Sequence, residues 1–132
     1  MNIPVATPLV VGTAMSDNQR DILIRLRGDV DIAAEACLAT VIDKIAQAQC
    51  ANVDIDLADV TFAGSTLLHF VDQLCTRLPA AATVTLCHPS SLIQEMLELV
   101  RLTDMVVVRS RLPRTWTVVT TTTATSSDQA TV

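Results

Sequence analysis

Aromatic residues are scarce in this chain of 132 residues, which has one Trp, two Phe and no Tyr. Proteins that bind single-stranded nucleic acid stack bases on such side chains, and proteins that bind duplexes present a basic surface. Here the net charge is −5 and the nine Lys and Arg residues form no cluster. The composition therefore argues against nucleic acid and against anionic membrane surfaces as partners.

Long apolar runs are also missing, and none approaches the roughly 18 residues of a membrane-spanning helix. The first residues, Met1–Pro8, lack the basic segment and the long apolar stretch of an export signal. We therefore expect a soluble, cytoplasmic protein without a membrane partner. Half of the residues are hydrophobic. That fraction is enough for one domain with a core of Leu, Ile, Val and Ala.

Glycine is rare, with three residues in the chain. This excludes the glycine-rich loop with which many domains hold a phosphate. The cysteines share an apolar sequence context and form no C-x-x-C pair: Cys37, Cys50, Cys75 and Cys87. Their spacing suits neither a zinc site nor a redox motif, so we interpret them as reduced, hydrophobic residues. The alternative is a disulfide that senses oxidation.

Strands and helices alternate along the chain. Period-two patterns predict strands at 22–27, 53–57 and 83–87, and short apolar runs predict strands at 9–11 and 105–108. Helical patterns predict helices over 32–49, 65–78 and 91–100. This order predicts an α/β fold with a sheet of about four to five mostly parallel strands. Because three of the strands alternate, we expect the helices mainly on one face and the other face partly wet.

The patterns also predict which residues are buried. On the strands, the inward positions are Ile22, Ile24, Leu26, Val53, Ile55 and Leu57, while Arg25, Arg27, Asp54 and Asp56 point outward. The helical stripes are Ala34, Leu38, Val41, Ile42 and Ile45, then Leu67, Val71, Leu74 and Leu78, then Leu92, Ile93, Met96, Leu97 and Val100. Gly28–Asp31 is predicted as a turn, and Ser91 with Gln94 as the capping box of the third helix.

Composition divides the chain into three parts. Residues 1–8 are predicted to be a flexible N-terminus, and residues 9–112 to form the single folded domain. Residues 113–132 are rich in Thr and Ser and are predicted to form a disordered tail, because they cannot bury enough surface to offset chain entropy. Within the tail, Trp116–Val119 could add an edge strand.

The most informative segment is Val53–Phe70, in which a strand passes through a short turn into a helix. Gly64, Ser65 and Thr66 lie at the junction. Backbone N–H groups without partners and the helix dipole favour negative charge there. Ser65 therefore has two interpretations. It can be a helix cap that contributes on the order of 1 kcal/mol, or a residue that is phosphorylated.

Other candidate chemistry is weaker. Ser65, His69, Asp72 and Thr76 share one polar stripe, but a single helix face places them in a row and a catalytic triad must converge. We therefore expect no enzyme activity. His88 stands alone, so it is not expected to bind a metal. Three acidic residues lie close in sequence, of which two occupy the wet face of a strand: Asp54, Asp56 and Asp59. We expect neither a metal nor a cofactor.

At this point the residues resemble the STAS domain, and within it the small bacterial anti-sigma factor antagonists. The resemblance covers about residues 9–110. It is carried by the turn Gly28-Asp-Val-Asp31, by the strand and turn Val53–Phe62, by Ser65-Thr66 at a helix start, and by Pro89–Asp104 as the last helix and its exit.

The resemblance implies a binding switch in transcription. Such a protein binds an anti-sigma factor that is also a serine kinase of the histidine-kinase-like ATPase type, and a sigma factor is released. The kinase then phosphorylates the serine at the start of the second helix, which ends the interaction, and a phosphatase restores it. Ser65 matches that serine, with Thr66 as the alternative. The implied partner-binding residues are Asp29, Asp31, Gly64, Ser65, Thr66, His69 and Asp72.

The chain departs from the family pattern at two positions. Gly64 replaces the usual aspartate before the serine, and Leu67 replaces the usual glycine two residues after it. Gly64 favours an alternative function as a STAS subunit of a transport or lipid-trafficking assembly, which binds an ATPase without being phosphorylated. A third hypothesis is nucleotide binding by the domain itself, against which the missing glycine-rich loop argues.

Overall fold

A computed structural model describes residues 7–16, 20–112 and 120–122. Its strands are β1 (Val10–Met15), β2 (Asp21–Val30), β3 (Asn52–Ala63), β4 (Thr83–Cys87), β5 (Val107–Arg109) and β6 (Thr120–Thr122). Its helices are α1 (Glu35–Ala48), α2 (Ser65–Arg77) and α3 (Ser91–Leu99), and short 3₁₀ turns cover Ile32–Ala34 and Leu102–Asp104. Strands and helices alternate as the sequence predicts.

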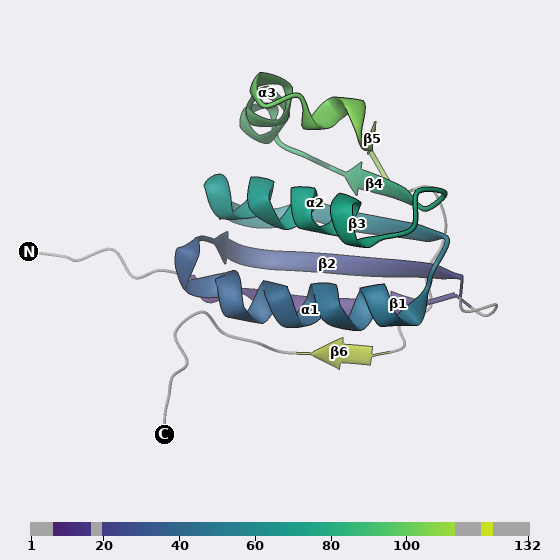
Figure 1. Ribbon diagram of the computed structural model, residues 1–132. Coiled ribbons are helices and arrows are strands. Elements are labelled where there is room, and N and C mark those ends of the chain that lie inside the picture. The colour runs from purple at the N-terminus through teal and green to yellow at the C-terminus, as the bar shows by residue number, and fades with distance from the viewer. Residues whose placement is uncertain (1–6, 17–19, 113–119, 123–132) are drawn as a thin grey trace, which may run out of the picture.

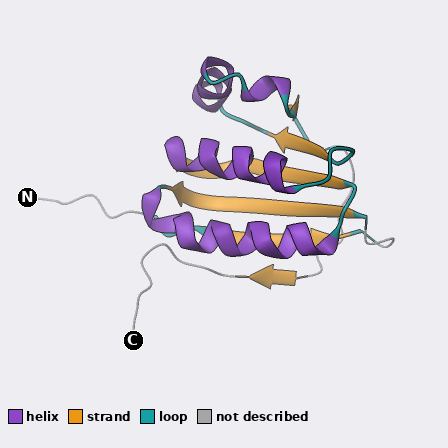
Figure 2. Cartoon of the chain, viewed as in Figure 1, coloured by secondary structure: helices purple, strands orange, loops and turns teal. Residues whose placement is uncertain are grey.

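The strands form one mixed sheet in the order β5-β4-β3-β2-β1-β6. Strands β2 to β5 pair in parallel, while β1 pairs antiparallel with both β2 and β6. Figure 1 shows α1 and α2 side by side across one face of this sheet, with α3 near the β4–β5 edge, and Figure 2 shows the same layers by element type. The predicted α/β class, the mostly parallel sheet and the helices on one face are confirmed.

The folded part of the chain includes residues near both termini that the sequence predicts to lie outside it. Thr120–Thr122 forms β6, so the prediction that 113–132 is entirely a disordered tail is wrong for these three residues. The predicted strand at Trp116–Val119 lies outside the described residues. Near the N-terminus, Thr7 is fixed to β2, because its carbonyl accepts the Asp29 N–H at 3.0 Å. The predicted flexible segment 1–8 therefore does not include Thr7.

The helix-facing side of the sheet forms the core. The predicted inward residues of β2 and β3 are all buried, and so are the predicted stripes of α1 and α2. In α3 only Ile93 and Leu97 of the predicted stripe are buried, while Leu92 and Val100 are exposed. This helix lies at the edge of the sheet, where a narrow i, i+4 stripe is enough. Its side-chain cap is Ser90, which accepts the Ile93 N–H at 3.2 Å, and not Ser91.

The predicted turn at Gly28–Asp31 is wrong in its first residues, because β2 continues to Val30. It does so because β3 also continues, to Ala63, and the two strands stay paired up to Val30 and Ala63. Register shifts on either side of Gly28 allow the strands to stay together. Gly28 has φ +103°, a backbone conformation that other residues rarely adopt.

The sheet face opposite the helices is not wet at its centre, which corrects a second expectation. Asp54 and Asp56 on β3 are buried, with exposed fractions of 1% and 4%. β3 lies between β2 and β4, and the residues in register with these aspartates on its neighbours are buried or half-buried: Leu23, Arg25, Thr85 and Cys87. Polar alternation in the sequence marks which side of the sheet a residue occupies, and not whether water reaches it.

Replacing Gly28 with Ala should unfold the protein more easily. A Cβ atom at this position would lie 2.2 Å from the Pro8 carbonyl oxygen, and the positive φ adds strain. We expect Gly28→Ala to lower the free energy of unfolding by about 2 kcal/mol or more. Gly12→Ala is the matched control, since its Cβ would meet nothing closer than 3.9 Å. Equal urea midpoints for the two variants would contradict the conclusion that position 28 requires glycine.

Candidate functional site

Ser65 is the first residue of α2 and its side chain is exposed. The N-cap position belongs to Gly64, which has no side chain to offer, and the Ser65 hydroxyl makes no hydrogen bond with the described residues. The interpretation of Ser65 as a helix cap is therefore wrong. Its hydroxyl is accessible at a helix N-terminus, where a negative charge is favourable.

Thr66, the alternative hydroxyl, is placed differently. Its exposed fraction is 6%, and it faces the space between α2 and α1. A kinase has to reach the oxygen that it modifies. Of the two predicted hydroxyls, only Ser65 is accessible in this conformation.

The pairing of β2 with β3 brings the predicted docking turns together. Asp29 lies opposite Phe62 and Val30 opposite Ala63, and the Gly64 N–H donates to the Val30 carbonyl at 3.3 Å. The turn that begins at Asp31 and the start of α2 are therefore neighbours at the carboxyl ends of parallel strands. This is the edge at which α/β sheets commonly place functional residues.

The two aspartates of this edge have structural partners. Asp29 accepts the Thr61 hydroxyl at 2.6 Å and the Thr7 N–H at 3.0 Å. Asp31 accepts the Ala33 N–H at 3.1 Å and so caps the 3₁₀ turn before α1. Both carboxylates stabilise the edge locally.

Two apolar residues at the same edge were not predicted as part of the site. Ile32 is 77% exposed and Phe62 is 54% exposed. A Cβ on Gly64 would lie 3.4 Å from the Phe62 ring, which places that ring beside the start of α2. The sequence did contain a signal for them. Neither residue belongs to a predicted core stripe, Ile32 directly follows Asp31, and Phe62 lies two residues before Gly64. We call Ile32, Phe62 and Ser65 with their turns the strand-end surface.

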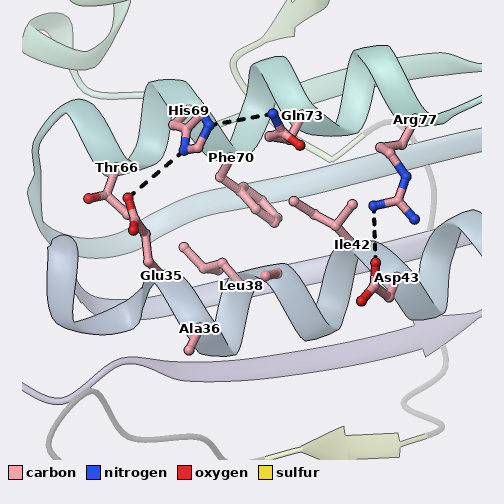
Figure 3. A pocket seen from close by; sticks show the side chains of 11 residues that line it. Glu35, Ala36, Leu38, Ile42, Asp43, Thr66, His69, Phe70, Gln73 and Arg77 are labelled. Atoms are coloured by element: carbon pink, nitrogen blue, oxygen red, sulfur yellow. Dashed lines mark hydrogen bonds and ion pairs between the residues drawn. The ribbon is translucent and has the colours of Figure 1, made fainter.

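A groove of about 360 Å³ lies between α1 and α2 (Figure 3). Its apolar floor includes Leu38, Ile42 and Phe70, and two polar side-chain pairs bridge the two helices above it. Arg77 Nη1 lies 3.0 Å from Asp43 Oδ1, and His69 Nδ1 lies 3.9 Å from Glu35 Oε2. Both pairs are largely exposed, so each contributes about 1 kcal/mol or less.

The polar stripe of α2 does not form a catalytic arrangement. His69 reaches across to Glu35 and, at 3.4 Å, to Gln73. Asp72 is exposed, and its carbonyl accepts the Thr76 hydroxyl at 2.9 Å. Neither His69 nor Asp72 is hydrogen-bonded to Ser65 among the described residues. Ser65, His69 and Asp72 therefore share the exposed side of α2 without converging on one another.

On the other face of the sheet, Asp56 is the centre of a hydrogen-bonded group. It accepts from Arg25 Nε at 3.0 Å and from the Ala58 N–H at 3.1 Å, and His88 Nδ1 lies 3.0 Å away. Burial by itself would raise the pKa of Asp56. The bonds to Ala58, His88 and Arg25 outweigh burial, so the pKa of this carboxyl is lowered. His88, which the sequence presents as isolated, is thus a partner of Asp56.

Metal-binding clusters are absent from the described residues, in which no three His, Cys, Asp or Glu side chains are grouped to hold an ion. No helix in the described part of the chain is long and apolar enough to cross a membrane. The four cysteines are separate thiols. Burial raises the pKa of each, that of Cys87 to about 11, which disfavours the reactive thiolate.

The fold agrees with the comparison to known families. The STAS domain family matches residues 13–118, which is most of the chain. The protein belongs to the STAS domain family. No curated protein matches the chain significantly in sequence.

Several solved structures share the fold. An anti-sigma factor antagonist from Mycobacterium paratuberculosis superposes with a TM-score of 0.67 at 18% identity, over 85% of this chain and 92% of that one. The unphosphorylated anti-sigma factor antagonist SpoIIAA gives 0.59 at 18% identity, over 72% and 84%. The phosphorylated form of SpoIIAA from Bacillus gives 0.52 at 17% identity, over 72% and 87%. At these identities the likeness establishes the fold.

The Asp56 group generates a prediction about acid stability. Its folded-state pKa lies below that of an unfolded chain, about 3.9. The stabilisation is therefore present above about pH 4 and is lost as the pH falls through the folded-state pKa. We expect Asp56→Asn to lower the free energy of unfolding by about 1–3 kcal/mol at neutral pH, with the difference shrinking in acid.

The matched control is Asp59→Asn on the same strand. Asp59 is 55% exposed and lies 3.6 Å from Arg27, so its removal should change stability little at any pH. Urea unfolding of both variants and the wild type between neutral and acid pH measures the effect. A constant difference between Asp56→Asn and wild type across that range would contradict the role of the carboxylate.

Proposed function

We propose that this protein is an anti-sigma factor antagonist whose binding is switched by phosphorylation of Ser65. Its partner is an anti-sigma factor that is a serine kinase of the histidine-kinase-like ATPase type, and binding to it releases a sigma factor. A phosphatase reverses the modification. The observation that carries the proposal is an accessible hydroxyl, without hydrogen bonds to the described residues, at the N-terminus of α2 in a STAS domain.

The strand-end surface provides the docking site. Phe62 and Ile32 supply exposed apolar area, and the outer face of α2 adds the polar residues His69 and Asp72. Apolar side chains surrounded by polar groups are typical of the centre of a protein–protein interface. Asp29, Asp31 and Gly64 hold the turns on which the apolar residues stand.

Phosphate at Ser65 changes this surface without changing the fold. It adds about −1.5 to −2 charges, and the N-terminus of α2 tolerates them because of its free N–H groups. A docked partner does not tolerate them, since its contact with Phe62 is disrupted by a strongly hydrated dianion. Asp31 and Glu35 already make the neighbourhood acidic, which strengthens the repulsion of an acidic partner. The protein acts as a regulator that binds and is modified, and it needs no catalytic residue of its own.

Ser65→Glu should weaken binding of the cognate anti-sigma factor by about tenfold or more, while Ser65→Ala should bind at least as well as wild type and escape phosphorylation. Isothermal titration with candidate anti-sigma kinases measures affinity, and mass spectrometry after incubation with ATP locates the phosphate. The matched control is Ser91→Glu. Ser91 is also an exposed first residue of a helix, but it starts α3. If no kinase that binds the protein phosphorylates Ser65 or Thr66, the switch is excluded.

Phe62→Ala should reduce partner affinity by about tenfold or more, because it removes the largest exposed apolar side chain beside Ser65. Thermal unfolding should change little, since the side chain is half exposed. Leu99→Ala, at the far end of α3 and 83% exposed, is the control and should bind like wild type. Equal losses in both variants would place the docking surface elsewhere.

The alternative function is a STAS subunit of a transport or lipid-trafficking assembly that binds an ATPase without being phosphorylated. Gly64 favours it, because the N-cap of α2 offers a kinase no carboxylate beside the serine. The same titrations separate the two functions. A transporter ATPase that binds wild type and Ser65→Glu equally well, with no anti-sigma factor bound, supports the alternative.

A further inference from the structure

Two strands that follow one another in the chain lie at opposite edges of the sheet. β5 ends at Arg109 and β6 begins at Thr120, with β4, β3, β2 and β1 between them (Figure 1). The pairing registers join one row of residues across the whole sheet: Arg109, Cys87, Asp56, Arg25, Gly12 and Thr121. Neighbouring strands are about 4.8 Å apart, so this row spans about 24 Å. The connection from β5 to β6 has to cover that distance.

The length of this connection limits its path. Twelve residue steps lead from Arg109 to Thr121, and a fully extended chain covers at most about 3.6 Å per step, or about 43 Å in all. A path outside α1 and α2 has to rise over a helix layer about 10–12 Å thick, in addition to the space between that layer and the sheet, and then descend again. That path is too long. The direct path across the opposite face is the shortest, and it stays within reach even if the chain rises about 10 Å above the sheet.

The opposite face is buried, although α1 and α2 lie on the other one (Figure 1). On this face Leu23, Asp54 and Thr85 are buried, and so is Ala14, which is in register with Leu23. Side chains stand roughly perpendicular to a sheet, so water reaches them on a bare face. A further segment therefore has to lie over these residues. The match to the STAS family also extends through the connection, to residue 118.

We propose that the sheet face opposite the helices is the docking surface for residues 113–119 of the same chain, which cross it from β5 to β6. Connectivity and length select this segment as the occupant. Trp116 is the seventh of the twelve steps, which places it near β2 and β3 at the middle of the row. Leu23 and Ala14 offer apolar contact area for a large aromatic side chain. Partner proteins are then restricted to the helix side and the strand-end surface.

The first test uses Trp116 as a probe in the unmodified protein, because it is the only Trp in the chain. We expect its emission in the native state to be shifted to shorter wavelength than in urea. Its acrylamide quenching constant should be severalfold lower than in urea, because a ring packed on the sheet is shielded from the quencher. Equal quenching constants in the native and the unfolded protein would overturn the proposal.

The second test identifies the face that the segment covers. A photoreactive benzophenone side chain replaces Trp116 in the full chain, and mass spectrometry locates the cross-links after irradiation. We expect cross-links within one chain to Leu23, Asp54 or Thr85. The same probe in place of Leu99, which is 83% exposed on α3, is the control and should reach none of these residues.

Circular dichroism first verifies that the photoreactive variant is folded, and the quenching test does not depend on it. In the folded variant, cross-links to α1 or α2 would place the segment on the wrong face. Cross-links to a second copy of the chain would show that the segment covers another molecule. Either result, or the absence of any cross-link, contradicts the proposal.

Discussion

The parallel pairing of β2 with β3 is the constraint on which the proposed docking surface depends. Neither turn at the carboxyl ends of these strands could position the other without it, because they are separated by the whole of α1. The Gly64 N–H bonded to the Val30 carbonyl fixes their distance. Gly28 supports the pairing, since its positive φ coincides with a register shift near the carboxyl end of β2. A backbone position in one strand thus influences how the turn after β2 and the start of α2 lie together.

The opposite face of the sheet contributes in a different way. A buried carboxylate is costly unless its oxygens are satisfied, and Asp56 is satisfied from three separate segments of the chain. Arg25 comes from β2 and His88 from the end of β4, so the group joins the strands on both sides of β3. The helix-facing core supplies the bulk of the stability by burial, and this polar group specifies how the central strands align.

The spacing of apolar residues and the order of the predicted strands and helices were enough to predict the fold. Residues such as Val53, Ile55, Leu67 and Val71 follow the local rule that apolar residues repeat every two positions in a strand and every three or four in a helix. This rule failed where residues distant in sequence determine whether a position is buried or lies in a strand. Asp56 alternates like a wet residue, and it is buried because β2 and β4 flank it. The segment that begins at Gly28 has the composition of a turn, but pairing with β3 keeps Gly28 in a strand. The candidate hydroxyl was found from sequence, but the difference between Ser65 and Thr66 depends on how α2 rotates against α1, and Phe62 became part of the surface only through the strand ends.

Ser65 occupies the first turn of α2 without capping it, and this has a consequence for the lifetime of the protein in a cell. A modified cap residue would lose the hydrogen bond that holds the helix end, and the frayed helix would be open to proteases. Here the Ser65 hydroxyl makes no bond that α2 needs. Under the proposed switch, both chemical forms should therefore resist degradation equally, and one pool of molecules could pass through many rounds of modification without new synthesis.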